Sequence, residues 1–240
     1  MITIFKKELN SFLNSLVAYI VIGVFLALTG LFTWVFEGNV LDYGYADLNS
    51  FFELTPYIFI FLIPAITMRL FSEEFKTGTI ELLFTKPLTD WQIILGKFLA
   101  AFLLVIIALL PTFLYYYSVY ELGSQKGNID TPAVIGSYIG LFFLGGVFVA
   151  IGLWASSLTD NQVVAFIIGA LACFLLYDGI HQLAQLFSGS TQYFIAYLGL
   201  NFHYDSISRG LIDSRTIIYF VSVIGLMLYL SRLQVSARKS

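Results

Sequence analysis

The sequence predicts an all-α membrane protein that crosses the bilayer six times. Of its 240 residues, 59% are hydrophobic and only 11% are charged, whereas soluble domains carry about 25% charged residues. A soluble fold cannot place so many apolar side chains in its interior, so the excess must face lipid. Six stretches approach the roughly 20 apolar residues that a span requires. They leave no room for a soluble domain larger than a loop, so residues 1–240 are expected to form a single transmembrane domain.

The predicted spans follow from apolar runs along the chain. The first and fourth runs contain no charged residue, and the second is short but can be extended by Phe51 and Phe52. In chain order, the six predicted spans are residues 16–36, 56–71, 98–117, 131–159, 163–177 and 216–230.

Lysine and arginine lie mostly on one side of these spans. If both termini share a side, that side holds nine of the twelve basic residues, and the other side holds only Lys126, Arg209 and Arg215. Positive residues favour the cytoplasmic side of a membrane. The sequence therefore predicts that the N- and C-termini are both cytoplasmic.

Residues 178–215, between the last two predicted spans, contain apolar stretches that are too short to cross the bilayer. An additional span there would place Arg232, Arg238 and Lys239 on the outer side, against the distribution of positive charge. We therefore expect short outer-face helices within residues 183–202, interfacial or partly re-entrant.

Local patterns indicate helix starts and close packing. Thr55-Pro56 and Thr131-Pro132 each place a capping residue before a proline that suits the first helical position. Small residues four positions apart in the fourth span permit close helix approach. Such faces join two subunits or pack helices within one bundle, and the sequence slightly favours the bundle. These small residues are Gly136 with Gly140, and Gly146 with Ala150.

Several functional classes are disfavoured. No acidic, basic or histidine residue lies at the centre of a predicted span, although ion-coupled transporters and voltage sensors usually need such residues there. The clustered basic residues of a nucleic-acid-binding surface are also missing. Asp178 and His181 are spaced for two metal ligands on one helix face, but a solvated helix end is the simpler interpretation. We expect no catalytic site, no metal site and no cleaved signal peptide.

Residues 1–15 predict an amphipathic helix ahead of the first span. Its apolar side chains recur at helical spacing, while Lys6, Lys7 and Asn10 occupy the rest of the wheel. Such a helix can lie in the membrane interface with its apolar face down. The alternative is a simple cytoplasmic extension of the first span. The apolar positions are Ile2, Phe5, Leu9, Phe12, Leu13 and Leu16.

The cytoplasmic loop at residues 72–92 carries a series of helix stop and start signals. Gly78 suits the C-terminal cap of one helix, and Thr79 suits the N-cap of a short helix over residues 80–85. Pro87 ends that helix. Thr89 and Gln92 then form a capping box for the helix that becomes the third span.

The short helix in this loop is apolar as well as acidic. Glu81 lies near its N-terminus, and four apolar residues surround it: Ile80, Leu82, Leu83 and Phe84. These must pack on the protein's own membrane-facing ends, on lipid headgroups, or in a groove of another protein. Force on such a helix would reach two spans directly.

This loop resembles a known family. The run EEFKTGTIELLFTKPLTDWQIILGKFLAA, residues 73–101, is similar to ABC-2 type transporter permeases and, among them, most similar to the gliding-motility-associated permease subunits. Other similar stretches are FIFLIPAITMR, ALLPTFLYYYS and DNQVVAFI. The resemblance implies six spans, an N-terminal connecting helix and a coupling helix between spans two and three. It also implies a bacterial inner-membrane location.

The resemblance further implies partners. The chain has no G-x-x-x-x-G-K-[ST] pattern, so ATP is expected to bind to and be hydrolysed by a separate ATPase subunit, and this chain is expected to hold no cofactor. A second permease copy or an auxiliary gliding-motility membrane subunit would complete the complex. Lys97 is expected to extend to the headgroups as an anchor. The implied ATPase-contacting residues are Glu74, Gly78, Thr79, Glu81, Leu82, Leu83 and Pro87.

Two other functions stay open at this point. One is a membrane anchor or scaffold of a motility or secretion complex that moves no solute. The other is a passive channel, which the lack of polar residues along the spans disfavours.

Overall fold

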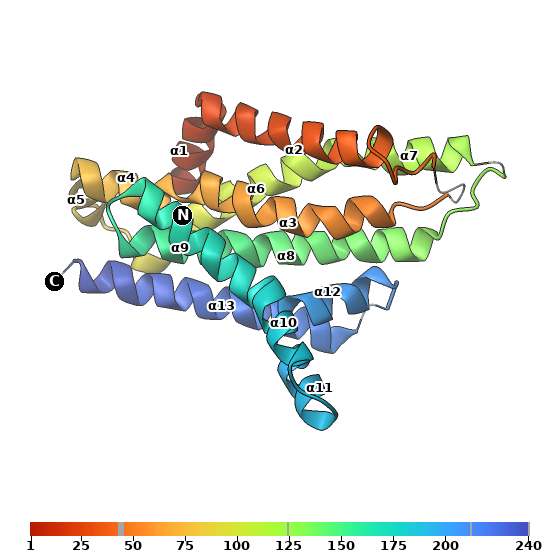
Figure 1. The fold of residues 1–240 in the computed structure, drawn as a ribbon. Helices are drawn as coiled ribbons and strands as arrows, with labels where there is room; N and C mark the ends of the chain where they lie inside the picture. Colours follow the sequence, from red (N-terminus) through yellow and green to blue (C-terminus); the bar gives the residue numbers. More distant parts are fainter. Residues whose placement is uncertain (43–45, 124, 212, 240) are drawn as a thin grey trace.

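The computed structural model describes residues 1–42, 46–123, 125–211 and 213–239, without the side chains of Leu82 and Phe84. Regular structure within these residues is entirely helical. Six helical segments are long and apolar enough to cross a membrane, which confirms the six predicted spans. They are packed side by side in one elongated bundle (Figure 1).

The spans are built from single or interrupted helices. The second span is interrupted at Met68, four residues after Pro64. The third span is interrupted by a 3₁₀ turn that contains Pro111. The segments are α2 (Leu16–Trp34); α3 (Asn49–Thr67) with α4 (Arg69–Thr77); α6 (Asp90–Leu109) and the 3₁₀ turn Leu110–Thr112 with α7 (Phe113–Leu122); α8 (Thr131–Leu158); α9 (Gln162–Phe174) and the π-turn Leu175–Gly179 with α10 (Ile180–Gln185); and α13 (Ser214–Ala237).

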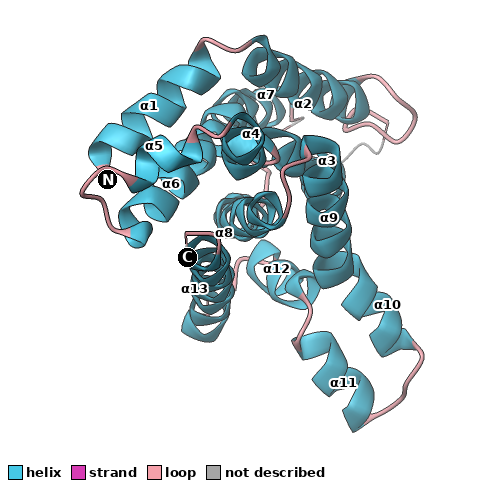
Figure 2. Cartoon of the chain, turned by 90° about the vertical axis from the view of Figure 1, so that its left-hand side faces the viewer, coloured by secondary structure: helices cyan, strands magenta, loops and turns pink. Residues whose placement is uncertain are grey.

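Helix α8 is the centre of the bundle. It packs against α3, α6, α9 and α13, and Figure 2 shows it surrounded by them. In its most apolar stretch 78% of residues are buried, against 28% in α2 and 22% in both α9 and α13. The outward faces of α2, α9 and α13 are therefore the apolar surfaces left for lipid or another membrane subunit.

Two glycines of α8 lie against the short helix α12 (Leu200–Ser208) of the same chain. A Cβ on Gly136 would lie 2.2 Å from the carbonyl oxygen of Ile207, and one on Gly140 would lie 3.0 Å from the ring of Tyr204, so only glycine lets α12 approach this closely. This settles the role of these two glycines in favour of packing within the bundle.

One predicted helix start is wrong, and the other is right except that its capping residue is displaced by one position. Helix α3 begins at Asn49, so Thr55 and Pro56 lie inside it, where the Thr55 hydroxyl donates to the Phe51 carbonyl at 2.7 Å. The N-cap of α8 is Asp130, whose carboxylate accepts from the backbone N–H of Ala133. The prediction at Thr55-Pro56 fails because α3 continues through the proline: the Tyr204 hydroxyl donates to the Phe52 carbonyl, which Pro56 leaves without its helical donor.

The N-terminal helix α1 (Ile2–Leu13) is separate from α2, which excludes a simple extension of the first span. Helix α1 ends with Asn14 as its C-cap, and the Ser15 hydroxyl caps α2 by accepting from the N–H of Val17 at 3.3 Å. Helix α1 packs against α6. Both chain ends lie at the same end of the bundle as the short helix α5 (Ile80–Phe84), which we call the near end (Figure 1).

Helices α10 and α11 (Ser190–Tyr197) form a hairpin that projects sideways from the bundle (Figures 1 and 2). None of the eight residues of α11 is buried. Helix α12 then returns the chain to α8, opposite the near end, at what we call the far end.

Candidate functional site

A buried lysine joins three helices at the near end. Lys97, in the second turn of α6, has a fully buried side chain. Its ammonium lies 2.9 Å from a carboxylate oxygen of Glu8 in α1 and 2.9 Å from one of Glu74 in α4. It also donates to the carbonyl oxygen of Leu70 at 2.6 Å. The expectation that Lys97 extends to the headgroups is therefore wrong, because two carboxylates hold it inside.

Lys7 completes this group of charges. Its ammonium is 2.6 Å from Glu74 and 3.3 Å from Glu8, so each carboxylate contacts both lysines. We call Lys7, Glu8, Glu74 and Lys97 the ion network. Two positive and two negative groups give it no formal net charge, and their mutual attraction offsets the desolvation cost of the buried members.

The network shifts the ionisation of its α1 members. Burial by itself would raise the pKa of Glu8, but the charges of Lys97 and Lys7 and their hydrogen bonds hold that pKa below its usual value. Burial would lower the pKa of Lys7, but its contacts with Glu74 and Glu8 raise it. Both shifts favour the ionised forms of Glu8 and Lys7.

Glycine allows the helices to approach closely enough for this contact. A Cβ on Gly96 would lie 2.9 Å from a methyl carbon of Ile4 and 3.2 Å from the carbonyl oxygen of Met1. Ile4, Glu8 and Phe12 form the buried stripe of α1 at a spacing of four residues. The glycine therefore lets α1 rest on α6, next to Lys97.

The base of α4 is fixed to the bundle core. The Ser156 hydroxyl of α8 accepts from the backbone N–H groups of Phe71 at 2.9 Å and Ser72 at 3.1 Å, and donates to the carbonyl of Met68 at 2.8 Å. One hydroxyl thus satisfies backbone groups that the break between α3 and α4 leaves free. Arg69 also donates to the Ser15 hydroxyl at 2.9 Å, connecting α4 to the start of α2.

The loop at residues 72–92 folds largely as its sequence predicts. Helix α4 ends at Gly78, whose φ of +71° is the left-handed conformation that favours glycine. Helix α5 follows, and Thr89 with Gln92 forms the predicted capping box of α6. Thr79 does not cap α5 with its side chain; its hydroxyl lies 2.9 Å from that of Thr77 instead.

The residues implied as ATPase contacts occupy different positions. Gly78, Thr79, Glu81 and Pro87 are exposed at the tip of the near end. Glu74 and Leu83 are buried, the first in the ion network and the second in the apolar core. The Leu82 side chain lies outside the described side chains.

The C-terminal segment also reaches this end, which sequence reasoning did not anticipate. The Arg238 guanidinium stacks 4.2 Å from the Phe75 ring centre, donates to the carbonyl of Leu158 at 2.7 Å and lies 3.6 Å from Asp160. A cavity of about 490 Å³ lies between these residues and Glu81. The C-terminus is thus part of the surface around α5.

Sequence reasoning also missed Glu8, Lys7 and the structural role of Lys97. Two signals were present: an acidic residue within the apolar stripe of α1, and a lysine inside an otherwise apolar helix. Neither signal names the partner, because Glu8 and Lys97 are 89 residues apart in sequence. Among the described residues, no group of three or more metal-ligating side chains comes together, and His181 lies 3.0 Å from Gln185.

Comparison with known proteins supports the resemblance. The family model for ABC-2 family transporter protein matches residues 2–196, which include the ion network, α5 and the first five spans. A search of curated proteins finds no match. Members of the matching family are the membrane components of ATP-binding-cassette transporters. Because the match covers more than half of the sequence, this six-span chain belongs to the ABC-2 transporter family.

Proposed function

We propose that this chain transmits movement of a separate ATPase subunit to the spans through residues 77–87, the exposed tip formed by the end of α4, α5 and the turn after it. The observation that supports this proposal is the ion network behind the tip. It joins α4, which leads into the tip, to α1 and to α6, which leads away from it.

The tip provides the contact surface. Glu81 is exposed in the first turn of α5 and makes no ion pair with any described residue, so its carboxylate is available to a basic group of the ATPase. Gly78 and Pro87 set the bends on either side. Glu74 and Leu83, being buried, act by holding the tip in place.

The network makes the helices behind the tip move together. Separating α4 from α1 and α6 would leave a buried lysine or carboxylate without its partner, which costs about 3–5 kcal/mol. A push on the tip is therefore transferred to α1, α4 and α6 as one unit. ATP shifts the permease between states only as far as the ATPase binds the two states differently.

Co-purification tests the proposal. The full chain is expressed with the ATPase of its complex, as wild type, Glu81→Lys and the control Glu37→Lys, which changes an exposed carboxylate at the far end. We expect Glu81→Lys to lose the ATPase or its stimulated ATP turnover, and Glu37→Lys to behave as wild type. If wild type binds no ATPase, or if Glu81→Lys binds and stimulates it normally, the proposal fails.

We further infer a role in gliding motility, in a bacterial inner membrane, with both termini cytoplasmic. The support is the resemblance of residues 73–101 to the gliding-motility permease subunits of the GldF type, together with the distribution of basic residues. A second permease copy or an auxiliary membrane subunit would complete the complex. Deletion of the gene should abolish surface spreading, and Glu81→Lys should not restore it. A complex that assembles and supports spreading without ATP turnover would instead be a scaffold.

A further inference from the structure

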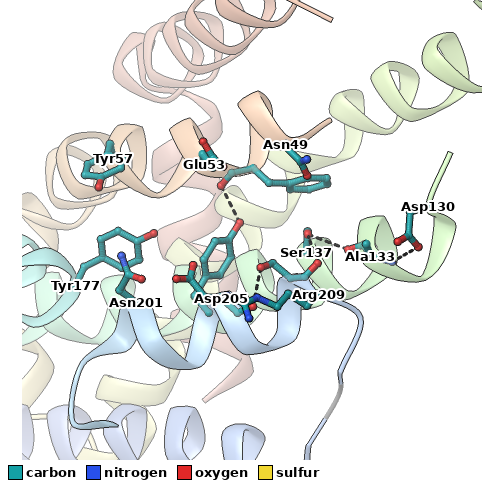
Figure 3. Close-up of a pocket in the computed structure, with 13 residues that line it drawn as sticks. Asn49, Glu53, Tyr57, Asp130, Ala133, Ser137, Tyr177, Asn201, Asp205 and Arg209 are labelled. Carbon is teal, nitrogen blue, oxygen red and sulfur yellow. Dashed lines mark hydrogen bonds between the residues drawn. The ribbon is translucent and has the colours of Figure 1, made fainter. Parts of the chain in front are cut away.

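A polar cleft opens at the far end, remote from the ion network. Its volume is about 650 Å³. One wall is α3, the opposite wall is α12, the start of α8 forms the floor, and the π-turn Leu175–Gly179 closes one end (Figure 3). This segment is a single turn of π-helix; such segments are rare, and those that occur are often found at functional sites.

The cleft carries unpaired negative charge. Glu53 and Asp205 approach from opposite walls, and neither carboxylate makes a hydrogen bond or ion pair with any residue that the structure describes. Asp130 also lines the cleft but caps α8. Arg209 is the only cation among the described lining residues, against three carboxylates. The cleft therefore favours a positively charged occupant.

Aromatic rings meet at the closed end of the cleft. The rings of Tyr57 and Tyr177 are perpendicular, with centres 5.7 Å apart. Figure 3 shows Asn201 beside Tyr177 and Asp205. The Asn201 side-chain oxygen has no hydrogen-bond partner among the residues that the structure describes, and it is buried beneath the cleft surface. Aromatic faces combined with carboxylates are a known means of binding ammonium groups.

We propose that this cleft binds the ammonium group of a ligand, supplied either by a free organic amine or by a lipid headgroup. Glu53 and Asp205 provide the countercharge, and the exposed ring of Tyr57, packed on the buried ring of Tyr177, provides an aromatic face. An anion would be repelled, and a neutral ligand would leave the carboxylates uncompensated. The proposal concerns binding alone and does not depend on the ATPase.

Choline is the probe, and 3,3-dimethylbutan-1-ol, its uncharged isostere, is the control ligand. The purified full chain is placed in phosphatidylglycerol nanodiscs, and binding of radiolabelled choline is measured by equilibrium dialysis. The alcohol is tested by its ability to displace choline. We expect saturable choline binding that the alcohol does not displace. Absence of choline binding, or displacement by the alcohol at equal concentration, would overturn the proposal.

Variants assign the binding to this cleft. Asp205→Asn and Glu53→Gln should each weaken choline binding about tenfold, equivalent to about 1.4 kcal/mol. Glu37→Gln, which neutralises an exposed carboxylate outside the cleft, should leave it unchanged. Tyr57→Leu should weaken binding and Tyr57→Phe should retain it, because the ring is what matters. Wild-type affinity in both Asp205→Asn and Glu53→Gln would contradict the proposal, and having two variants guards against one that does not fold.

The source of the ammonium group is decided by the lipid. If headgroups reach the cleft, replacing phosphatidylglycerol with phosphatidylcholine should reduce choline binding by competition. If the ligand is a free amine, the affinity should be the same in both nanodiscs. Either result is consistent with the cleft and identifies its ligand.

Discussion

The Tyr204 hydroxyl donates a buried hydrogen bond of 2.8 Å to the carbonyl oxygen of Phe52. Phe52 lies four residues before Pro56, which has no backbone N–H, so this carbonyl cannot receive its usual helical partner. A tyrosine 152 residues away in sequence therefore supplies the missing donor. This contact connects α12 to α3 beneath the far-end cleft and explains how a proline is accommodated inside α3.

The contact predicts a cost that depends on the proline. Tyr204→Phe should destabilise the protein by about 1–3 kcal/mol, because it leaves a buried carbonyl unsatisfied. In a Pro56→Ala background the helix regains its own N–H, so the same change should cost clearly less. Thermal unfolding of the four proteins in detergent gives this coupling. Equal costs in the two backgrounds would contradict the assignment.

Close packing of α8 predicts a sharp contrast between two glycines. Gly136→Ala would place a Cβ against a backbone carbonyl that cannot yield easily, and should destabilise by about 1–3 kcal/mol. Gly23→Ala, in α2, meets no atom within 4 Å and should be neutral or slightly stabilising. The measurement is the midpoint of thermal unfolding of each variant. A similar effect for both would mean that α12 does not approach α8 as closely as described.

Removal of Lys97 should destabilise the near end strongly. Lys97→Met leaves Glu8 and Glu74 with Lys7 as their one remaining network cation, at a cost of about 3 kcal/mol. Adding Glu8→Gln to Lys97→Met should recover part of this loss, because the charges then balance. Thermal unfolding of the single and double variants tests this. A double variant less stable than the single one would show that charge balance is not the cause.

The same network predicts a pH dependence with a defined sign. The pKa of Glu8 is lower in the folded protein than its ordinary value of 4.5. Its contribution is therefore present above pH 4.5 and lost as the pH falls through the folded pKa. Lys7 has a raised pKa, so its contribution is present below its ordinary value of 10.5 and lost as the pH rises through the folded pKa.

Thermal unfolding across pH can separate these contributions. The wild type should lose stability below pH 4.5 more steeply than Glu8→Gln, which has no carboxyl group to protonate there. A control, Glu37→Gln, should keep the wild-type profile. Identical acid profiles for wild type and Glu8→Gln would argue against a depressed pKa at Glu8.

The left-handed conformation of Gly78 predicts a graded series. Gly78→Ala should destabilise the turn between α4 and α5 by about 1–2 kcal/mol, because an L side chain is strained at positive φ. Gly78→Asn should cost less, since asparagine tolerates this conformation. A Cβ here would meet no atom within 4 Å, so the effect comes from the backbone. ATPase co-purification should fall in the same order, and equal loss in both variants would point to a direct contact instead.

Some of this fold depends on neighbouring residues alone and was predictable. The six spans follow from local hydropathy, the end of α4 from Gly78, and the start of α6 from Thr89 and Gln92. In each case the determining groups lie within one or two helical turns. Local chemistry was therefore sufficient.

Predictions failed where a distant partner replaced a local one. Pro56 predicts a helix start because its missing N–H is costly inside a helix, but the Tyr204 hydroxyl offsets that cost by donating to the Phe52 carbonyl. Lys97 reads as a surface anchor because an unpaired buried ammonium is prohibitive, but Glu8 and Glu74 pair with it.

The sequence by itself determined the class of protein, its six spans and the position of the loop at the near end. Tertiary structure decided which charges are buried together, which residues of that loop remain exposed, and that a polar cleft forms between α3 and α12. The physical reason is the separation in sequence over which each interaction acts. Hydropathy and capping act between neighbouring residues, whereas charge pairing, carbonyl satisfaction and cleft formation depend on groups brought together only when the helices pack.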